Sequence, residues 1–116
     1  MSSNQNRGGV ELSVYTASDE DEFAPLLGEV FAERDPPAVA VGLTPREFES
    51  FVRLFCATAA EQRLTVIARS ADSGALVGAV LAEDSATPLP GGLETLSSKF
   101  DPIFDILSQL DTEYRA

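Results

Sequence analysis

Apolar and polar residues alternate over Val10–Thr16, close to the start of the chain. A period of two is typical of a strand with one face buried and one face in water, so this segment is predicted to be a half-buried strand. Tyr15 falls on the polar side of the alternation. The aliphatic residues that share the other side are Val10, Leu12 and Val14.

Two segments with helical periodicity follow. The first is predicted to begin near Asp21, after an acidic run that suits the positive end of a helix dipole, and to end by Arg34 before Pro36 and Pro37. Residues 35–43 are predicted to be a loop. The second helix has the clearest start signal, with Thr44 as N-cap, Pro45 in the first turn and Glu47 three residues after the cap. It is predicted to end near Gln62 or Arg63.

A hairpin and a last helix complete the pattern. Leu64–Ser70 and Ala75–Ala82 are rich in β-formers and flank the turn residues Asp72-Ser73-Gly74, which predicts an antiparallel pair. Residues 83–98 hold two prolines and two glycines and are predicted to be a loop. The last helix is predicted to open at Asp101. Its apolar face is formed by Ile103, Ile106, Leu107, Leu110 and Tyr114.

The predicted fold is therefore α+β, in the order β-α-α-β-β-α, with a small antiparallel sheet packed by helices. Residues 1–9 are predicted to be a disordered tail, and residues 10–116 a single domain.

Composition narrows the chemistry. The 116 residues carry a net charge of −11 and contain no histidine, which removes Ser-His-Asp and Cys-His catalysis and the commonest zinc ligand. The excess of carboxylates argues against nucleic-acid and membrane partners. The start of the chain lacks the apolar stretch of a signal peptide, so a cytoplasmic location is expected. Cys56 lies in an apolar helical pattern and is interpreted as a buried small hydrophobe.

The predicted order, together with the hairpin, resembles the first half of the GNAT family of N-acetyltransferases. The likeness rests on Thr65-Val66-Ile67-Ala68-Arg69 and on Ser73-Gly74-Ala75-Leu76-Val77-Gly78-Ala79-Val80. Within the family, the segment Phe31-Ala32-Glu33-Arg34-Asp35-Pro36-Pro37-Ala38 resembles the arylalkylamine N-acetyltransferase branch. The resemblance implies a general base at the position of Pro36, which cannot accept a proton, and Asp35 is the adjacent carboxylate.

The resemblance also implies an acetyl-CoA loop of the form Q/R-x-x-G-x-G/A, and no segment of the sequence has that spacing. The chain is accordingly expected to be a truncated GNAT-like domain whose third strand keeps an open apolar edge. Three ways of covering that edge are expected: a homodimer, a complementing chain, or the last helix. The predicted association edge comprises Ala75, Leu76, Val77, Gly78, Ala79, Val80, Leu81 and Ala82.

Three functions remain open from the sequence. The first is a module that binds a small molecule or a partner protein and does not bind acetyl-CoA by itself. The second is an N-acyltransferase that gains its acetyl-CoA site from a partner chain or by dimerisation. The third is a recruited enzyme with carboxylate chemistry. Its candidate acids and bases are Glu33, Asp35, Glu83 and Asp84.

Overall fold

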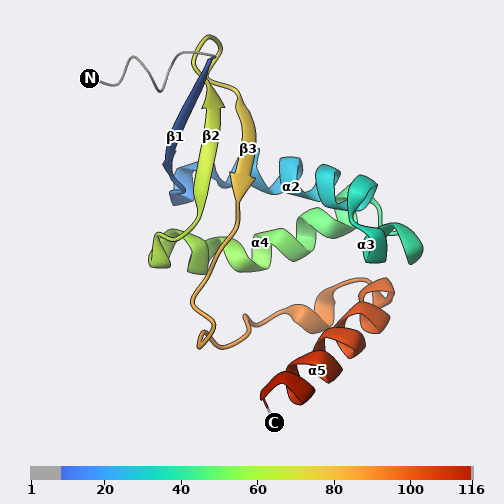
Figure 1. Cartoon of the computed structure of the whole chain (residues 1–116). Coiled ribbons are helices and arrows are strands. Elements are labelled where there is room, and N and C mark those ends of the chain that lie inside the picture. The colour runs from blue at the N-terminus through green and yellow to red at the C-terminus, as the bar shows by residue number, and fades with distance from the viewer. Residues whose placement is uncertain (1–8, 116) are drawn as a thin grey trace.

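A computed structural model describes residues 9–115, except for the side chains of residues 114 and 115. The predicted tail, residues 1–9, therefore lies almost wholly outside the described residues. The elements follow one another as predicted, and the fold is α+β (Figure 1). They are β1 Val10–Val14, the 3-10 helix η1 Ala17–Asp19, α2 Glu20–Arg34, α3 Pro36–Ala40, α4 Pro45–Gln62, β2 Val66–Ser70, β3 Leu76–Val80, the 3-10 helices η2 Leu93–Thr95 and η3 Ser98–Phe100, and α5 Asp101–Arg115.

The three strands form one antiparallel sheet in the order β1-β2-β3, so the predicted hairpin is confirmed. Ser13 lies opposite Ile67 on β2, and Ile67 lies opposite Ala79 on β3. The register shifts between Ala68 and Arg69, where Val77 is the extra residue of a bulge. Within the described part of the chain, β1 and β3 are the two edge strands.

The buried face of the sheet is the face that carries Tyr15, and not the face of the aliphatic residues of β1. Tyr15 and Ile67 are buried, whereas Leu12 is 70% exposed. Thr65 is also buried on this face. Its hydroxyl donates a hydrogen bond to the Ala82 carbonyl oxygen and accepts one from the Ala82 N–H, both at 3.1 Å. Helices α2 and α4 lie against this face, and nothing in the described chain covers the other.

Helices α2 and α4 supply most of the core. The predicted capping box of α4 is confirmed: Thr44 Oγ1 accepts from the Glu47 N–H, and Glu47 Oε1 accepts from the Thr44 N–H. The helix ends at Gln62, and Arg63 takes a left-handed backbone conformation as its C-cap. The backbones of the two helices are in close contact at Gly28, where an added Cβ would lie 2.6 Å from the carbonyl oxygen of Pro45.

The prediction of a loop over residues 35–43 is wrong in part, because Pro36–Ala40 form the short helix α3. Asp35 is its N-cap and accepts a hydrogen bond from the Ala38 N–H at 3.3 Å. The two prolines occupy the first turn, where their fixed φ is already helical and their missing N–H groups are not needed. Proline therefore ended α2 as predicted, but it also began a new helix.

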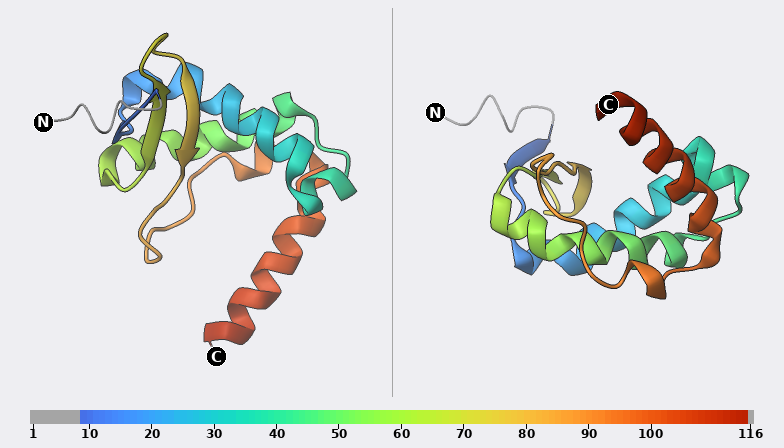
Figure 2. Two further views of the ribbon diagram at one scale, coloured as in Figure 1. Left: turned by 45° about the horizontal axis from the view of Figure 1, so that its top comes forward. Right: turned by 90° about the horizontal axis from the view of Figure 1, so that it is seen from below.

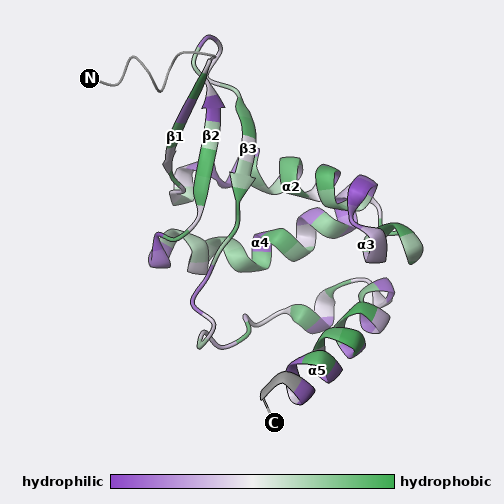
Figure 3. Ribbon diagram, viewed as in Figure 1, coloured by the Kyte–Doolittle hydropathy of each residue, from purple (hydrophilic) through white to green (hydrophobic). Residues whose placement is uncertain are grey.

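Helix α5 leaves the rest of the molecule at an angle, and its C-terminal half projects away from both α4 and the sheet (Figure 2). Ile103 and Phe104 pack against the core, but Leu107 and Leu110 are 56% and 58% exposed. Helix α5 does not lie over the edge of β3, so it is not the cover that the sequence offered as one alternative. Apolar residues nonetheless recur along its length (Figure 3).

Candidate binding groove between α4 and α5

Six of the seven phenylalanines form one continuous aromatic cluster that joins α2, α4, η3 and α5. Phe51 is at its centre, with ring centroids 4.9 Å from Phe55 and 5.1 Å from Phe100. Phe100 in turn stacks on Phe104 at 5.5 Å. Such pairs stabilise beyond their buried area, so the cluster fixes the first turn of α5 against α4. Its members are Phe31, Phe48, Phe51, Phe55, Phe100 and Phe104.

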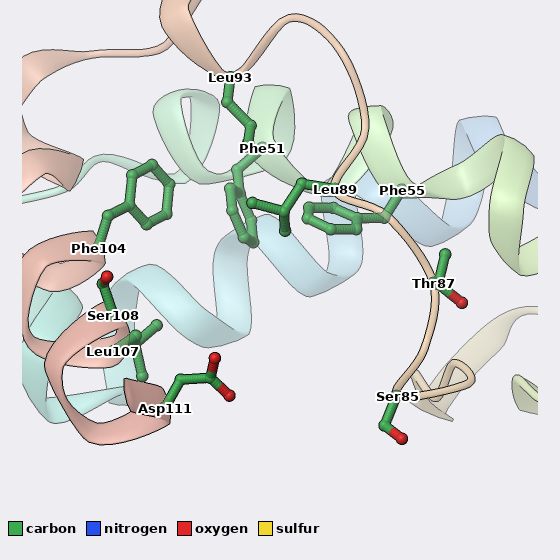
Figure 4. A pocket seen from close by; sticks show the side chains of 10 residues that line it. All are labelled: Phe51, Phe55, Ser85, Thr87, Leu89, Leu93, Phe104, Leu107, Ser108 and Asp111. Carbon is green, nitrogen blue, oxygen red and sulfur yellow. The ribbon is translucent and has the colours of Figure 1, made fainter. Parts of the chain in front are cut away.

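One side of this cluster is open and forms the floor of a cavity of about 580 Å³ (Figure 4). Helix α4 contributes the floor, α5 one wall, and the segment between β3 and η2 the other wall. The lining is mostly apolar, with three hydroxyl groups and one carboxylate. It comprises Phe51, Phe55, Ser85, Thr87, Leu89, Leu93, Phe104, Leu107, Ser108 and Asp111.

A second cavity of about 270 Å³ lies against the first turns of α5 and also touches Asp35 of the α3 cap and Leu81 after β3. It shares Phe51, Phe104 and Leu107 with the larger cavity. The two cavities are therefore neighbours that meet at these side chains, and together we call them the α4–α5 groove.

Hydrogen bonds hold the wall that has no regular structure. Gln62, at the end of α4, donates from Nε2 to Thr87 Oγ1 at 2.6 Å and accepts from the Asp84 N–H at 2.9 Å. Asp84 Oδ1 accepts from the Ala86 N–H at 2.8 Å. One glutamine side chain thus fixes residues 84–87 against α4, so this wall of the groove is preformed.

Lys99 holds the other end of the groove. Its ammonium group donates to Glu47 Oε1 at 2.9 Å and to the carbonyl oxygen of Gly42 at 3.1 Å. The hydrogen bond from Lys99, and then that from the Thr44 N–H, lower the pKa of Glu47 from 4.5 to about 2. The N-terminal cap of α4 is therefore also the attachment point of the segment that leads into α5.

The four carboxylates predicted as acids or bases do not converge. Glu33 is exposed on α2, and Asp35 is the cap of α3. Glu83 and Asp84 lie beside the last turn of α4, whereas the cavity that Asp35 touches lies at Phe48. Glu83 and Asp84 follow Leu81, which lines that cavity, but neither of them lines it. The structure thus brings together neither a carboxylate pair nor a carboxylate with a nucleophile from these four.

Cys56 is buried in α4, and its thiol donates to the carbonyl oxygen of Val52 at 3.4 Å. Burial raises the pKa of this thiol, which opposes the thiolate form that a nucleophile needs. The interpretation of Cys56 as a core residue is confirmed. Among the described residues, no three Cys, Asp or Glu side chains are placed to hold a metal ion.

The predicted association edge, Ala75–Ala82, contains β3, which is an edge strand of the sheet. Association through this edge stays a prediction. No helix of the described chain combines the length and the apolar character needed to cross a bilayer.

Comparison with protein-family models, with curated proteins and with solved structures finds no match to this chain. The resemblance to GNAT acetyltransferases therefore stays a prediction from the sequence.

The residues that line the groove were not predicted as a site. Phe51 and Phe55 follow the helical period of the second predicted helix, and Leu107 lies on the apolar face predicted for the last helix, whereas Phe104 was not assigned to that face. The sequence gives one indication of such a site. The last helix has more apolar residues than a helix packed on one side against a small sheet would bury.

Proposed function

We propose that this domain is a protein-interaction module that binds an apolar helical segment of another polypeptide in the α4–α5 groove. The observation that carries the proposal is the exposed apolar face of α5 next to an aromatic floor. Phe51 and Phe55 form that floor, Leu107 lines the cavity from α5, and Leu110, three residues further along α5, is 58% exposed. Exposed apolar surface of this kind marks interaction sites on soluble domains.

A helix is the occupant that the lining favours. No strand lines the larger cavity, so the groove offers side chains and not an open backbone edge. Leu107 and Leu110, three residues apart on α5, are both more than half exposed and form a ridge that fits between the side chains of another helix. Binding of an amphipathic helix in an apolar groove is an established mode of peptide recognition.

A titration with a designed peptide tests the proposal. The probe is a helical peptide of about 20 residues, long enough to be helical in water, with leucine at every third or fourth position and glutamine elsewhere. Isothermal calorimetry is expected to show binding with a Kd in the micromolar range, about −8 kcal/mol. In Leu107→Gln the affinity is expected to fall about tenfold, since one buried leucine contributes about 1.5–3 kcal/mol.

The control is Val39→Gln, which exchanges an aliphatic residue of similar exposure, 53%, on α3. It is expected to bind as the unchanged protein does. Absence of binding by the unchanged protein, or an equal loss in both variants, would contradict the proposal. Both substituted side chains are largely in water, so both variants are expected to fold, which circular dichroism verifies.

A further inference from the structure

The outer side of the sheet is an apolar surface that lines neither cavity and that no described helix covers (Figure 1). The register aligns rows of side chains across its three strands. One row holds Leu12, Ala68 and Gly78, and the next holds Val14, Val66 and Val80. We call these six residues the outer face. Leu12 is 70% exposed and Val80 is 67% exposed, and contiguous exposed apolar surface of this kind marks interaction sites.

The outer face carries no charge. The charged residues of the three strands, Glu11 and Arg69, point to the opposite side of the sheet, where Arg69 pairs with Asp19 at 2.8 Å. A contact between two copies of the chain has to join two molecules that each have a net charge of −11. Because the strand residues of this face are neutral, two copies can meet here without like charges opposed across the contact.

The first row of the outer face is complementary to itself. Leu12 is the large side chain of that row, and Gly78, at its other end, has no side chain, with Ala68 of the central strand between them. Two sheets packed face to face about a twofold axis parallel to β2 would bring Leu12 of each copy over Gly78 of the other. A twofold contact uses the same patch on both molecules, so it requires a patch of this kind.

Gly78 indicates that another molecule comes close at this point. Its backbone is not left-handed, so the bulge at Val77 does not require a glycine. An added Cβ would have the Cβ of Ala68 as its nearest neighbour, at 4.0 Å, so the packing of the described chain does not require a glycine either. A glycine inside a strand weakens the strand, and it often marks a site where a ligand or another backbone approaches.

We propose that the outer face binds the outer face of a second copy, sheet on sheet, with Leu12 of each copy over Gly78 of the other. This contact is separate from the α4–α5 groove and does not rest on the proposed function. It is also separate from pairing through the edge of β3, which would leave the outer face open.

The contact is small, because each of the three strands has five residues. Such a sheet measures about 17 by 14 Å, at about 3.3 Å per residue and about 4.8 Å between strands. A standard interface buries about 800 Å² per partner, so this one belongs with the weak interfaces. A dissociation constant of about 0.1 mM is therefore expected.

Sedimentation velocity of the full chain at about 5 µM and at about 0.5 mM tests the proposal, since these concentrations lie on either side of the expected dissociation constant. The average mass is expected to rise by more than half between them, whether or not the edge of β3 already pairs at the lower one. Leu12→Gln is expected to weaken this step at least tenfold, because a symmetric contact loses two buried leucines. Leu110→Gln, which changes an exposed leucine of α5, is the control and is expected to leave the step unchanged.

Gly78→Ala separates association from folding. The added methyl group would hold the two sheets apart, so the step is expected to weaken about tenfold, a large effect for one methyl group. The free energy of unfolding, measured with urea at about 5 µM, is expected to stay unchanged or to rise, because alanine removes the cost of a glycine in a strand.

A direct contact between the copies is expected as a nuclear Overhauser effect from the Leu12 methyl groups to the Gly78 Hα at about 0.5 mM. Within one chain β2 lies between these residues, which places their strands about 10 Å apart, so the signal has to come from two molecules. A mass that does not rise, a rise that Leu12→Gln leaves intact, or a loss in Leu110→Gln instead would overturn the second copy as the occupant of the outer face. Each of these results leaves helix binding in the groove to its own test.

Discussion

Gly28 lies where α2 crosses α4, and the two backbones are so close there that a side chain has no space. An added Cβ would lie 2.6 Å from the Pro45 carbonyl oxygen and 2.9 Å from the Glu49 nitrogen. Both neighbours are backbone atoms of α4, and they cannot turn aside as the end of a side chain could. Alanine is the better helix former in isolation, so this glycine is explained by packing and not by local propensity.

Gly28→Ala is predicted to lower the free energy of unfolding by about 1–3 kcal/mol, because it forces α2 away from α4. Denaturant unfolding followed by circular dichroism measures the change. Glu29→Ala, at the next and exposed position of the same helix, is the control and is expected to change stability by less than about 0.5 kcal/mol. A stabilised Gly28→Ala variant would show that helix propensity outweighs the contact.

Single residues also show where sequence reasoning was sufficient and where it was not. Thr44, Pro45 and Glu47 act within one turn, so their spacing predicted the start of α4 correctly. The buried side of β1 depends on what packs against the sheet, which a period of two does not reveal. Leu12 is more hydrophobic than Tyr15, yet Tyr15 is the buried residue, because α2 and α4 lie on its side.

At the scale of elements, α5 is attached by the aromatic cluster and by one ion pair between distant parts of the chain. Lys99, which precedes α5, bonds to Glu47 in the cap of α4 and to Gly42 in the turn before it. Without this contact the aromatic cluster remains, in which Phe100 and Phe104 both contact Phe51. Helix existence was predictable from periodicity, but the direction of α5 was not, because it is set by this contact and by the aromatic cluster.

Lys99→Met is predicted to speed amide hydrogen exchange in residues 98–113 and to leave the amides of β1, β2 and β3 unchanged. Arg46→Met, an exposed cation in the first turn of α4, is the control and is expected to change neither. Exchange that speeds equally throughout the molecule would contradict a local role for Lys99.

The same contact predicts a pH dependence. The pKa of Glu47 is lowered in the folded protein from 4.5 to about 2, so this carboxylate stabilises the fold above pH 4.5, and the contribution is lost as the pH falls toward 2. Over that interval, exchange in residues 98–113 is expected to accelerate in the unchanged protein and to change less in Lys99→Met. An equal acceleration in both proteins would show that the acid sensitivity does not come from the contact between Glu47 and Lys99.

At the scale of the whole molecule, two apolar surfaces remain open, the α4–α5 groove and the outer side of the sheet with its β3 edge. Leu12 and Val80 lie on that outer side and are 70% and 67% exposed. The order of elements and the α+β class could be predicted from the sequence. The groove could not, because it forms between segments 30 to 60 residues apart whose relative placement no local pattern determines.

Self-association through the edge of β3 stays a prediction from the sequence. Val77→Lys, on the exposed bulge of β3, is predicted to weaken any dimer, because a charge on an edge strand opposes strand pairing. Sedimentation velocity at micromolar concentration is expected to show a dimer that Val77→Lys weakens and that Val39→Lys does not. A monomer at every concentration would contradict association through this edge.

The central claim is that the α4–α5 groove binds a helix, and methyl NMR spectra recorded during the peptide titration test it most directly. Addition of the helical peptide of leucine and glutamine is expected to shift the methyl signals of Leu89, Leu93 and Leu107 in the groove, and to leave those of Val39 on α3 and Val77 on β3 in place. Shifts centred on Val77 and the sheet, or none at saturating peptide, would contradict it.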